Sequence, residues 1–421
     1  MWNEDQSLLD KIREALESTQ QRNIDAATNE LFFHYTNSNG LLGILQSNSL
    51  WATHYRFMND ISEFEYGLDV IFKVIDEYLK SQELEETEIQ RITNVFHLQK
   101  SLELNDYNTY IVCFCTNGDL LSQWRGYAGG SGYAIGFCGE LFNNQDHIDE
   151  LKNSTNIQWN FGKVYYGSDA EKLALEIIPY CVDIVKSYLV NYPEGSDRNG
   201  RIEFIQVLNS LKWLFHYIPF FSKHDGFREE MEWRLVGTPK GIPSSKYRAT
   251  TEGLIPYAEF KFSEGLFSID PVKCFPAEYI NEDGTPKRMK ETPFSRKEYK
   301  EMHDNMWSMG PSHGRVNYID TIIIGPTSNF ETQKYAVEDL IKQLAHKAIY
   351  PYMLKRGIDF ETKGMVKALE NEQILSDSMN PVVNSEINKS IVFDENYFYF
   401  CNSSLYLKLP KVCQSKIPFK S

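Results

Sequence analysis

The sequence predicts an α+β fold with a split mixed β-sheet and large helical insertions. Short apolar runs of strand length recur along the chain, from residues 31–36 to residues 319–325. Longer segments with apolar residues at helical spacing lie between them, notably over 61–103 and 169–222. No stretch approaches the roughly 20 uninterrupted apolar residues that a membrane-spanning helix needs. We therefore expect a soluble protein of mixed secondary structure.

Size and charge limit the partners that the chain can have. It has 421 residues and a mass of 48.9 kDa, enough for one large domain with insertions or for two domains. Its net charge of -15 opposes non-specific binding to a nucleic-acid backbone. The acidic N-terminus lacks the basic and apolar regions of a signal peptide. These features predict a cytoplasmic protein with no membrane partner.

The seven cysteines predict neither disulfides nor a metal site. They are odd in number and lie mostly in apolar surroundings, which is typical of reduced core residues. The one close pair, Cys113 and Cys115, has no second cysteine pair or histidine cluster that would complete a zinc site. We expect no bound metal.

The first quarter of the chain alternates helices and strands. Residues 3–28 carry apolar side chains at helical spacing and predict one amphipathic helix. Residues 31–36 predict the first strand, and Asn37 is a suitable N-cap for a short helix that ends near residue 49. A second short strand begins at Leu50, and charged helical segments then continue to about residue 103.

The next segment combines the most apolar strand with a glycine-rich loop. Residues 107–116 form a run too apolar to face water. A helical turn over 119–127 follows, then a loop with several glycines, then a strand over 133–137. No G-x-G-x-x-G or Walker pattern is present, so we do not expect a dinucleotide-binding or P-loop fold.

The remaining chain contains further strands and helices. Strands are predicted at 156–166, 228–236, 257–262, 319–325, 391–400 and 404–409, and helices at 169–193, 199–222 and 331–346. The elements divide the chain into three parts, which are an N-terminal helix at 1–28, a core at 29–349 and a C-terminal extension at 350–421 that ends in a core strand. A basic insertion at about 265–315 is interpreted as a solvated loop in preference to a substrate or nucleic-acid patch.

Residues 228–236 place charged side chains in an otherwise buried strand. In an extended chain Glu230, Glu232 and Arg234 point to one face, and the apolar residues between them point to the other. Charges aligned on a packed strand cost stability unless they are paired or used. Two interpretations stay open: an internal ion pair that stabilises the sheet, or a functional site.

Six short sequence blocks occur in one order along the chain. They are FHYT at 33–36, LWAT at 50–53 with Asn59 and Asp60, SQWR at 122–125 with YAIGF at 133–137, EMEWR at 230–234, IIGP at 323–326 and SKIPF at 415–419. The series resembles a bacterial domain-of-unknown-function family found among phage-defence loci. The resemblance implies an effector in anti-phage defence with a phage-derived trigger or inhibitor as a partner.

A second resemblance concerns the ADP-ribosyltransferase fold. The His-Tyr-Thr strand end at 34–36, followed by a helix of Gly-Leu-Leu-Gly-Ile-Leu at 40–45, is similar to the first strand and helix of that fold. This implies an ADP-ribosyltransferase-like split mixed β-sheet with NAD as the substrate. The NAD site of that fold uses three elements: a histidine on the first strand, the second strand with its following helix, and a glutamate at the start of a late strand. All three occur here in that order.

The same resemblance assigns roles to residues. Glu232 is the catalytic carboxylate, Glu230 its acceptor-side partner and His34 the anchor for NAD. The predicted NAD-binding residues are His34, Tyr35, Thr36, Gln123, Trp124, Arg125, Tyr133 and Arg234. Cleavage of the bond to nicotinamide develops positive charge on the ribose, which a carboxylate stabilises, while an aromatic face holds the leaving ring. The candidates for that ring are Trp124, Tyr127 and Tyr133, and the candidates for the pyrophosphate are Arg125 and Arg234.

The expected function is an NAD-dependent ADP-ribosyltransferase-like effector, or an NAD glycohydrolase that uses the same residues. The acceptor, a protein or a nucleic acid, stays open. The alternative is a non-catalytic sensor or protein-interaction module, in which the charged strand is an ion-pair ladder. The two alternatives differ in geometry. An enzyme requires one cleft that brings together His34, either Gln123 or Trp124, and either Glu230 or Glu232. A non-catalytic module does not require it.

Overall fold

The computed structural model of the protein describes most of the chain. It covers residues 2–59, 62–106, 108–129, 131–143, 145–192, 198–241, 245–250, 253–262, 318–354, 391–394, 397–400, 405–408 and 410–418. The predicted basic insertion at about 265–315 lies outside the described residues, as does Asp60.

The chain forms two compact units, and each is assembled from three separate segments. Unit 1 comprises Met1–Thr28, Trp51–Thr116 and Phe142–Phe260. Unit 2 comprises Asn29–Leu50, Asn117–Leu141 and Lys261–Ser421. Each unit contains both helices and strands, so the predicted mixture of α and β structure is confirmed. The predicted division into 1–28, 29–349 and 350–421 follows chain order and stays a prediction.

Unit 1 is built on a largely antiparallel sheet. Its strands are β2 (Ser49–His54), β3 (Tyr110–Cys115), β5 (Ile157–Lys163), β8 (Glu232–Pro239), β9 (Lys246–Thr250) and β10 (Gly253–Lys261). They lie in the order β5-β8-β3-β2-β10-β9, with antiparallel pairs β5–β8, β8–β3, β3–β2 and β10–β9. A short parallel pair joins β6 (Tyr165–Tyr166) to β7 (Ser222–Lys223). The charged strand β8 therefore lies inside this sheet, between β5 and β3.

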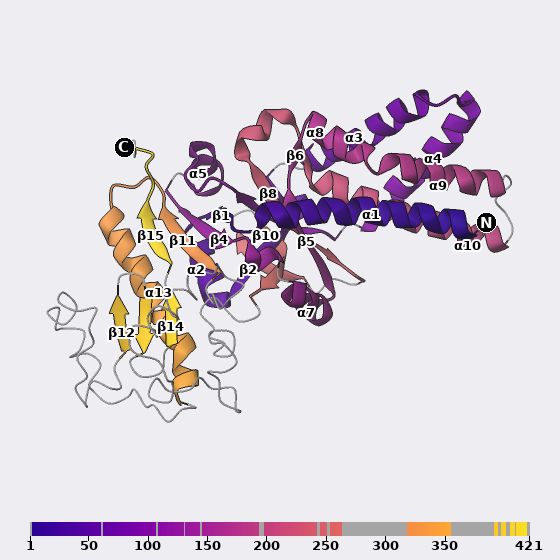
Figure 1. The fold of residues 1–421 in the computed structure, drawn as a ribbon. Coiled ribbons are helices and arrows are strands. Elements are labelled where there is room, and N and C mark those ends of the chain that lie inside the picture. Colours follow the sequence, from indigo (N-terminus) through magenta and orange to yellow (C-terminus); the bar gives the residue numbers. More distant parts are fainter. Residues whose placement is uncertain are drawn as a thin grey trace. The chain divides into compact units, whose positions relative to one another are not determined.

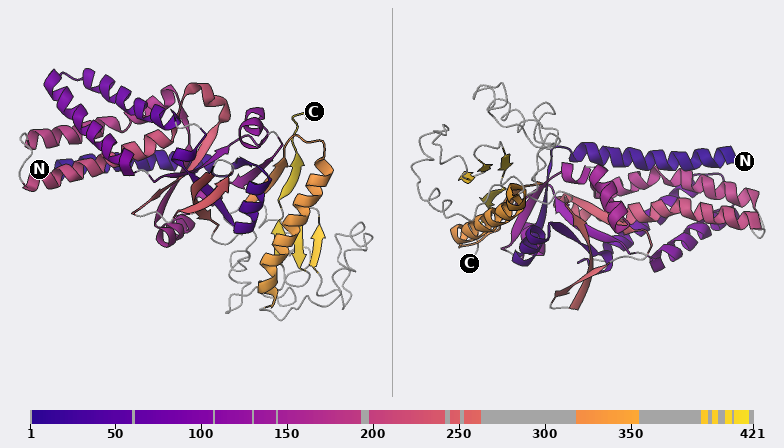
Figure 2. Two further views of the ribbon diagram at one scale, coloured as in Figure 1. Left: turned by 180° about the vertical axis from the view of Figure 1, so that it is seen from behind. Right: turned by 90° about the horizontal axis from the view of Figure 1, so that it is seen from below.

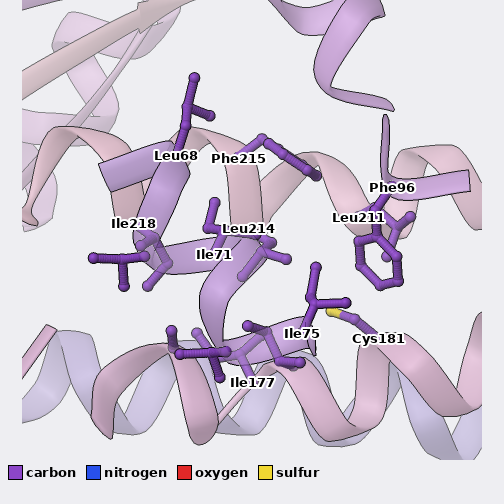
Figure 3. Close-up of a cluster of buried hydrophobic side chains, with 14 of the residues drawn as sticks. Leu68, Ile71, Ile75, Phe96, Ile177, Cys181, Leu211, Leu214, Phe215 and Ile218 are labelled. Carbon is purple, nitrogen blue, oxygen red and sulfur yellow. The ribbon is translucent and has the colours of Figure 1, made fainter. Parts of the chain in front are cut away.

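Six described helices of unit 1 pack against one face of that sheet, in a buried cluster that Ile111 on β3 and Val236 on β8 also join. They are α1 (Trp2–Ala27), α3 (Ser62–Lys80), α4 (Glu86–Asp106), α8 (Ser168–Leu175), α9 (Ile178–Asn191) and α10 (Arg198–Tyr217). A further helix, α7 (Gln145–Thr155), contacts β5, and the unit also has the 3-10 turns η1 (Tyr55–Phe57), η2 (Ile218–Phe220) and η3 (Asp225–Glu230). α1 packs along α9, and α9 along α10 (Figures 1 and 2). Their apolar faces meet those of α3 and α8 in one buried cluster (Figure 3).

Two of the predicted helices are shorter than expected, and each ends at a proline. The predicted helix at 169–193 is divided into α8 and α9, with Pro179 in the first turn of α9. The predicted helix at 199–222 ends at Tyr217, and Pro219 lies in the turn that follows. Proline has no backbone N–H to donate and clashes with the preceding helical turn, so a helix can start at it but cannot run through it.

The other face of the unit 1 sheet packs aromatic rings. Phe142 stacks on Phe161 with ring centroids 4.2 Å apart, and Phe161 stacks on Trp233 at 5.2 Å. Phe260 meets Trp159 edge to face at 5.4 Å. Trp233 is thus a core residue, and β8 has apolar side chains behind it and charged side chains in front, as the sequence pattern predicts.

Unit 2 contains a mixed sheet. Its strands are β1 (Leu31–Thr36), β4 (Tyr133–Cys138), β11 (Ile319–Ile324) and β15 (Lys411–Gln414), in the order β15-β11-β4-β1. β4 is antiparallel to both β1 and β11, whereas β11 and β15 are parallel. The predicted mixed sheet is therefore confirmed, and its ADP-ribosyltransferase-like form stays a prediction. A separate antiparallel group consists of β12 (Ile391–Asp394), β13 (Tyr397–Phe400) and β14 (Leu405–Lys408).

The described helices of unit 2 pack against its strands. They are α2 (Ser38–Ser47), α5 (Leu121–Tyr127) and α13 (Phe330–Leu354), and one further turn, α6 (Glu140–Asn143), follows β4. Asn37 is the N-cap of α2, as predicted, because its side chain accepts a hydrogen bond from the Gly40 N–H at 3.0 Å. α13 packs against β11 and β15 (Figures 1 and 2).

Three properties of the described ranges bear on the broad class of the protein. No helix there has both the length and the apolar content to cross a membrane. The cysteines that the ranges include are not joined in disulfides: Cys113, Cys115, Cys138, Cys181 and Cys413. Cys413 is exposed and departs from the expected core position.

Candidate functional site

The charged strand starts later than the sequence predicts. β8 begins at Glu232, whereas Glu230 ends the 3-10 turn η3. Met231 between them has φ 44°, in the left-handed region that residues other than glycine seldom adopt. The chain therefore changes direction between the two glutamates. The prediction that Glu230 shares a strand face with Glu232 and Arg234 is wrong for this reason.

Lys223 nevertheless brings the two glutamates together. Its Nζ lies 2.5 Å from a Glu230 carboxylate oxygen and 3.1 Å from Glu232 Oε2. The same ammonium lies 2.8 Å from Glu63 Oε1. The Lys223 side chain is only 1% exposed. Its three N–H donors are thus matched by three carboxylates in a place that water hardly reaches.

Arg234 is the second cation of the site. Its Nε and Nη2 donate to the two oxygens of Glu232 at 2.8 and 2.9 Å, which is a bidentate pair. Nη2 also donates to Glu63, and Nη1 donates to the Phe220 carbonyl at 2.9 Å. Both carboxylate oxygens of Glu232 are therefore held by cations.

We call this group the Lys223 cluster. It consists of Glu63, Lys223, Glu230, Glu232 and Arg234. Three carboxylates face two cations, so the cluster carries one net negative charge when every group is ionised. The side chains of Glu63 and Glu230 are 16% and 15% exposed, against 7% for Glu232. Glu63 and Glu230 thus form the edge of the cluster that solvent or a ligand can reach.

The two glutamates on Lys223 have pKa shifts of opposite direction. Burial acts to raise the pKa of Glu232, but Arg234 and Lys223 outweigh it and lower that pKa to about 2. Burial raises the pKa of Glu230 above its ordinary value, against the opposing effect of Lys223. One carboxylate is therefore kept ionised, while its neighbour holds a proton more easily than an ordinary glutamate.

Two neighbours complete the surroundings of Glu232. The Tyr166 hydroxyl accepts a hydrogen bond from the Glu232 backbone N–H at 2.8 Å. Cys113 lies directly opposite Arg234 in the β3–β8 ladder. Burial raises the pKa of the Cys113 thiol well above its ordinary value, so it is a neutral thiol and not a thiolate nucleophile.

The cluster does not resemble a metal site. In the described ranges no group of three or more His, Cys, Asp or Glu side chains is arranged to hold an ion. Between the three carboxylates of the cluster, the space that a cation would take is filled by the ammonium of Lys223 and the guanidinium of Arg234.

The remaining predicted site residues belong to unit 2. Trp124 is fully buried, its ring meets that of Tyr35 edge to face at 4.8 Å, and its Nε1 donates to Asp119 at 2.8 Å. Gln123 is buried beside it, whereas Arg125 on the same helix is exposed. Trp124 therefore packs in the core of unit 2.

Asp119 is a residue of unit 2 that sequence reasoning missed. Its Oδ1 accepts from Trp124 Nε1 and from the Ser415 hydroxyl, and its Oδ2 accepts from the Lys416 backbone N–H at 2.7 Å. It thereby joins the SQWR and SKIPF blocks, which are almost 300 residues apart in the chain. The occurrence of both blocks in one ordered series was the only signal of this contact in the sequence.

The predicted residues fall into two groups. His34, Tyr35, Thr36, Gln123, Trp124, Arg125 and Tyr133 belong to unit 2, and Glu230, Glu232 and Arg234 belong to unit 1. Within unit 1 the structure brings the predicted glutamates and arginine together and adds Lys223 and Glu63. The convergence of both groups on one cleft stays a prediction.

A family model matches a part of the chain that includes most of the cluster. Residues 123–235 match the family described as Protein of unknown function (DUF2971). The DUF2971 match contains every residue of the Lys223 cluster except Glu63. No curated protein and no solved structure matches the chain. The description of DUF2971 specifies no reaction, so the function has to be argued from the geometry of the cluster.

Proposed function

We propose that the chain cleaves the bond between ribose and nicotinamide in NAD at the Lys223 cluster. The reaction would be that of an ADP-ribosyltransferase-like effector or of an NAD glycohydrolase. The observation that supports it is the pair Glu230 and Glu232, which share one ammonium yet have pKa shifts of opposite direction. Pairs of carboxyl groups with separated pKa values are typical of sites that divide charge stabilisation from proton transfer.

In this proposal each carboxylate has one task. Glu232 stays ionised, and its charge stabilises the positive charge that develops on the ribose as the bond to nicotinamide breaks. The electron pair of that bond leaves with nicotinamide. Glu230 lies at the reachable edge of the cluster and takes the proton of the water or acceptor hydroxyl that attacks the ribose carbon. Its raised pKa makes it a stronger base than an ordinary glutamate.

The test is release of nicotinamide from NAD by the purified protein, its Glu230→Gln variant and its Glu229→Gln variant. Removal of a general base lowers kcat by about 100-fold or more, so E230Q should lose most of the activity. Glu229 is exposed in the same 3-10 turn, so E229Q should keep the activity and serves as the matched control. Wild-type protein that neither binds NAD nor releases nicotinamide, or E230Q with full activity, would contradict the proposal.

A non-catalytic module is the second candidate, and one observation favours it. Each oxygen of Glu232 is already bonded to Lys223 or Arg234, as in a purely structural ion-pair network. In that case E230Q would change stability and leave no NAD turnover to lose. A role in phage defence rests on the six sequence blocks, and we propose to test it by plating phage on cells that carry the wild-type gene or the E230Q gene.

A further inference from the structure

A guanidinium with no acidic partner among the described residues lies at the far edge of the unit 1 sheet. Arg248 on β9 is partly buried, and its Nη2 donates to Thr53 Oγ1 on β2 at 2.9 Å. Within the described part of the chain it makes no ion pair. Burial lowers the pKa of Arg248, and only Tyr257 acts against that effect. A partly buried arginine normally pairs with a carboxylate or a phosphate.

The nearest candidate acid on these strands is already engaged. Glu259 on β10 lies two residues from Tyr257, on the same face. It pairs with Lys246 Nζ at 2.8 Å. Lys246 and Arg248 are themselves two residues apart on β9, so in the part of the chain that the structure describes one cation of this strand has an acidic partner and the other has none.

Two aromatic rings lie on the same face of the sheet as this guanidinium. Trp51 on β2 and Tyr257 on β10 have ring centroids 5.0 Å apart with planes inclined by 30°. Trp51 is partly exposed, and its indole N–H has no hydrogen-bond partner among the described residues. Trp51 shares a face of β2 with Thr53, the hydrogen-bond partner of Arg248. Cationic, hydroxyl and aromatic groups thus come together on one side of the sheet.

We propose that Arg248, Thr53, Trp51 and Tyr257 bind a nucleoside diphosphate. The guanidinium and the hydroxyl donate to the phosphate oxygens, for which arginine offers a planar pair of donors. The base lies against the ring of Trp51, since aromatic side chains stack on any base. The inference goes beyond the carboxylate chemistry of the Lys223 cluster and does not depend on it, because binding can be measured without turnover.

The site and the Lys223 cluster lie on the same face of the sheet. Thr53 is opposite Ile111 in the ladder, and Cys113, two residues along β3, is opposite Arg234. Along the sheet β9 is four strand spacings from β8, about 19 Å, and β2, which carries Trp51 and Thr53, is two spacings from it, about 10 Å. The nucleoside diphosphate site is therefore a separate location from the carboxylates.

The test is calorimetric titration of the full chain with ADP. Loss of hydrogen bonds to a charged group lowers affinity by roughly 10- to 100-fold, so Arg248→Ala should weaken ADP binding by at least that lower factor. Lys246→Ala removes the same charge from the same strand. It should leave the affinity for ADP within about twofold of wild type, because Lys246 forms its ion pair with Glu259. Arg248→Lys keeps the charge without the planar donors and should bind with intermediate affinity.

Two further ligands separate the parts of the proposal. Pyrophosphate has the anion without the base, and adenosine has the base without the anion. We expect ADP to bind more tightly than either, and Trp51→Leu to reduce ADP binding to the level of pyrophosphate. Equal binding of ADP and pyrophosphate would overturn the role of the aromatic pair. Absence of ADP binding to the wild-type protein, or ADP binding that both Arg248→Ala and Arg248→Lys leave unchanged, would overturn the site as a whole.

Discussion

Glu232 shows how a carboxylate can be buried and still ionised. Burial alone would raise its pKa, yet Arg234 and Lys223 contact both of its oxygens and reverse the shift. Such a pair is costly to break, because removal of one partner leaves an uncompensated buried charge. The stability of unit 1 should therefore depend on pH in a direction that can be worked out from this residue.

A first prediction concerns Glu232→Gln. The pKa of Glu232 falls from the ordinary 4.5 to about 2 on folding, so ionised Glu232 stabilises the folded state above pH 4.5, and this contribution is lost as pH falls toward 2. A shift of this size corresponds to on the order of 3 kcal/mol. We expect E232Q to be less stable than wild type by about this amount at pH 7. The difference should shrink toward zero near pH 2, as measured by urea unfolding at several pH values.

The control for this prediction is Glu229→Gln, which removes an exposed carboxylate from the neighbouring turn and should change stability little at any pH. The contribution of Glu230 to the free energy of unfolding changes with pH in the opposite direction. Because its pKa is raised in the folded state, ionised Glu230 destabilises the fold, and protonation at lower pH removes this cost. A stability difference between E232Q and wild type that stays constant from pH 7 to pH 2 would show that the pKa of Glu232 is not lowered.

At the scale of elements, Asp119 holds the last strand of unit 2. β15 pairs in parallel with β11, and the Ser415 N–H that follows it donates to the Ile324 carbonyl at 2.8 Å. The Asp119 carboxylate accepts hydrogen bonds from the Ser415 hydroxyl and from the Lys416 N–H. The segment that follows β15 is therefore bonded both to β11 and to Asp119. A four-residue edge strand makes few hydrogen bonds of its own. We therefore expect the hydrogen bonds to Asp119 to determine how often β15 detaches from β11.

The second structural prediction compares Asp119→Ala with Ser415→Ala. Ser415→Ala removes two hydrogen bonds, the one that the hydroxyl donates to Asp119 and the one that it accepts from the Ile417 N–H, and should cost about 1 to 2 kcal/mol. Asp119→Ala also leaves the buried Trp124 N–H unpaired, so it should cost about 3 kcal/mol and raise hydrogen exchange in β15. The double variant should cost less than the sum of the two single variants, because both single changes remove the hydrogen bond between Ser415 and Asp119.

Asp149→Ala provides the matched control, since Asp149 is exposed on α7 and should contribute less than about 0.5 kcal/mol. Costs of Asp119→Ala and Ser415→Ala that simply add in the double variant would show that Asp119 does not act through Ser415.

At the scale of the whole molecule, chain order and spatial order differ. Each unit draws on three segments, and unit 2 takes its last two sheet strands from beyond residue 318. A chain that ends at residue 260 contains all of unit 1 but leaves β4 without β11. β4 is buried along its whole length in the complete chain. Its unpaired apolar edge would then be open to other chains.

We therefore expect the fragment 1–260 to aggregate, in contrast to the full chain. An exposed edge of apolar residues such as Ile135 and Phe137 offers unpaired backbone groups to a second copy. Size-exclusion chromatography of both proteins at the same concentration measures this. A monomeric, soluble fragment would show that β11 is dispensable for covering β4.

Local pattern in the sequence determined most of the elements of this protein. The helical spacing at 3–28, the apolar run of β3 and the cap at Asn37 depend on residues near one another in the chain, so each could be predicted without a fold. The alternation in β8 likewise showed that Glu232 and Arg234 share a face. The exceptions are also local, since Met231 and Pro179 interrupt elements that periodicity alone would continue.

Only the tertiary structure decided which charges meet. In the sequence Lys223 is an ordinary turn residue. Glu63 lies 160 residues earlier and is an acidic residue in the first turn of a helix. They reach Glu232 because α3, β7 and β8 pack around one point, which no local pattern specifies. The same holds for the hydrogen bond between Ser415 and Asp119 and for that between Arg248 and Thr53. The physical reason is that side-chain periodicity depends on backbone geometry over a few residues, whereas ion pairs depend on which distant segments pack together.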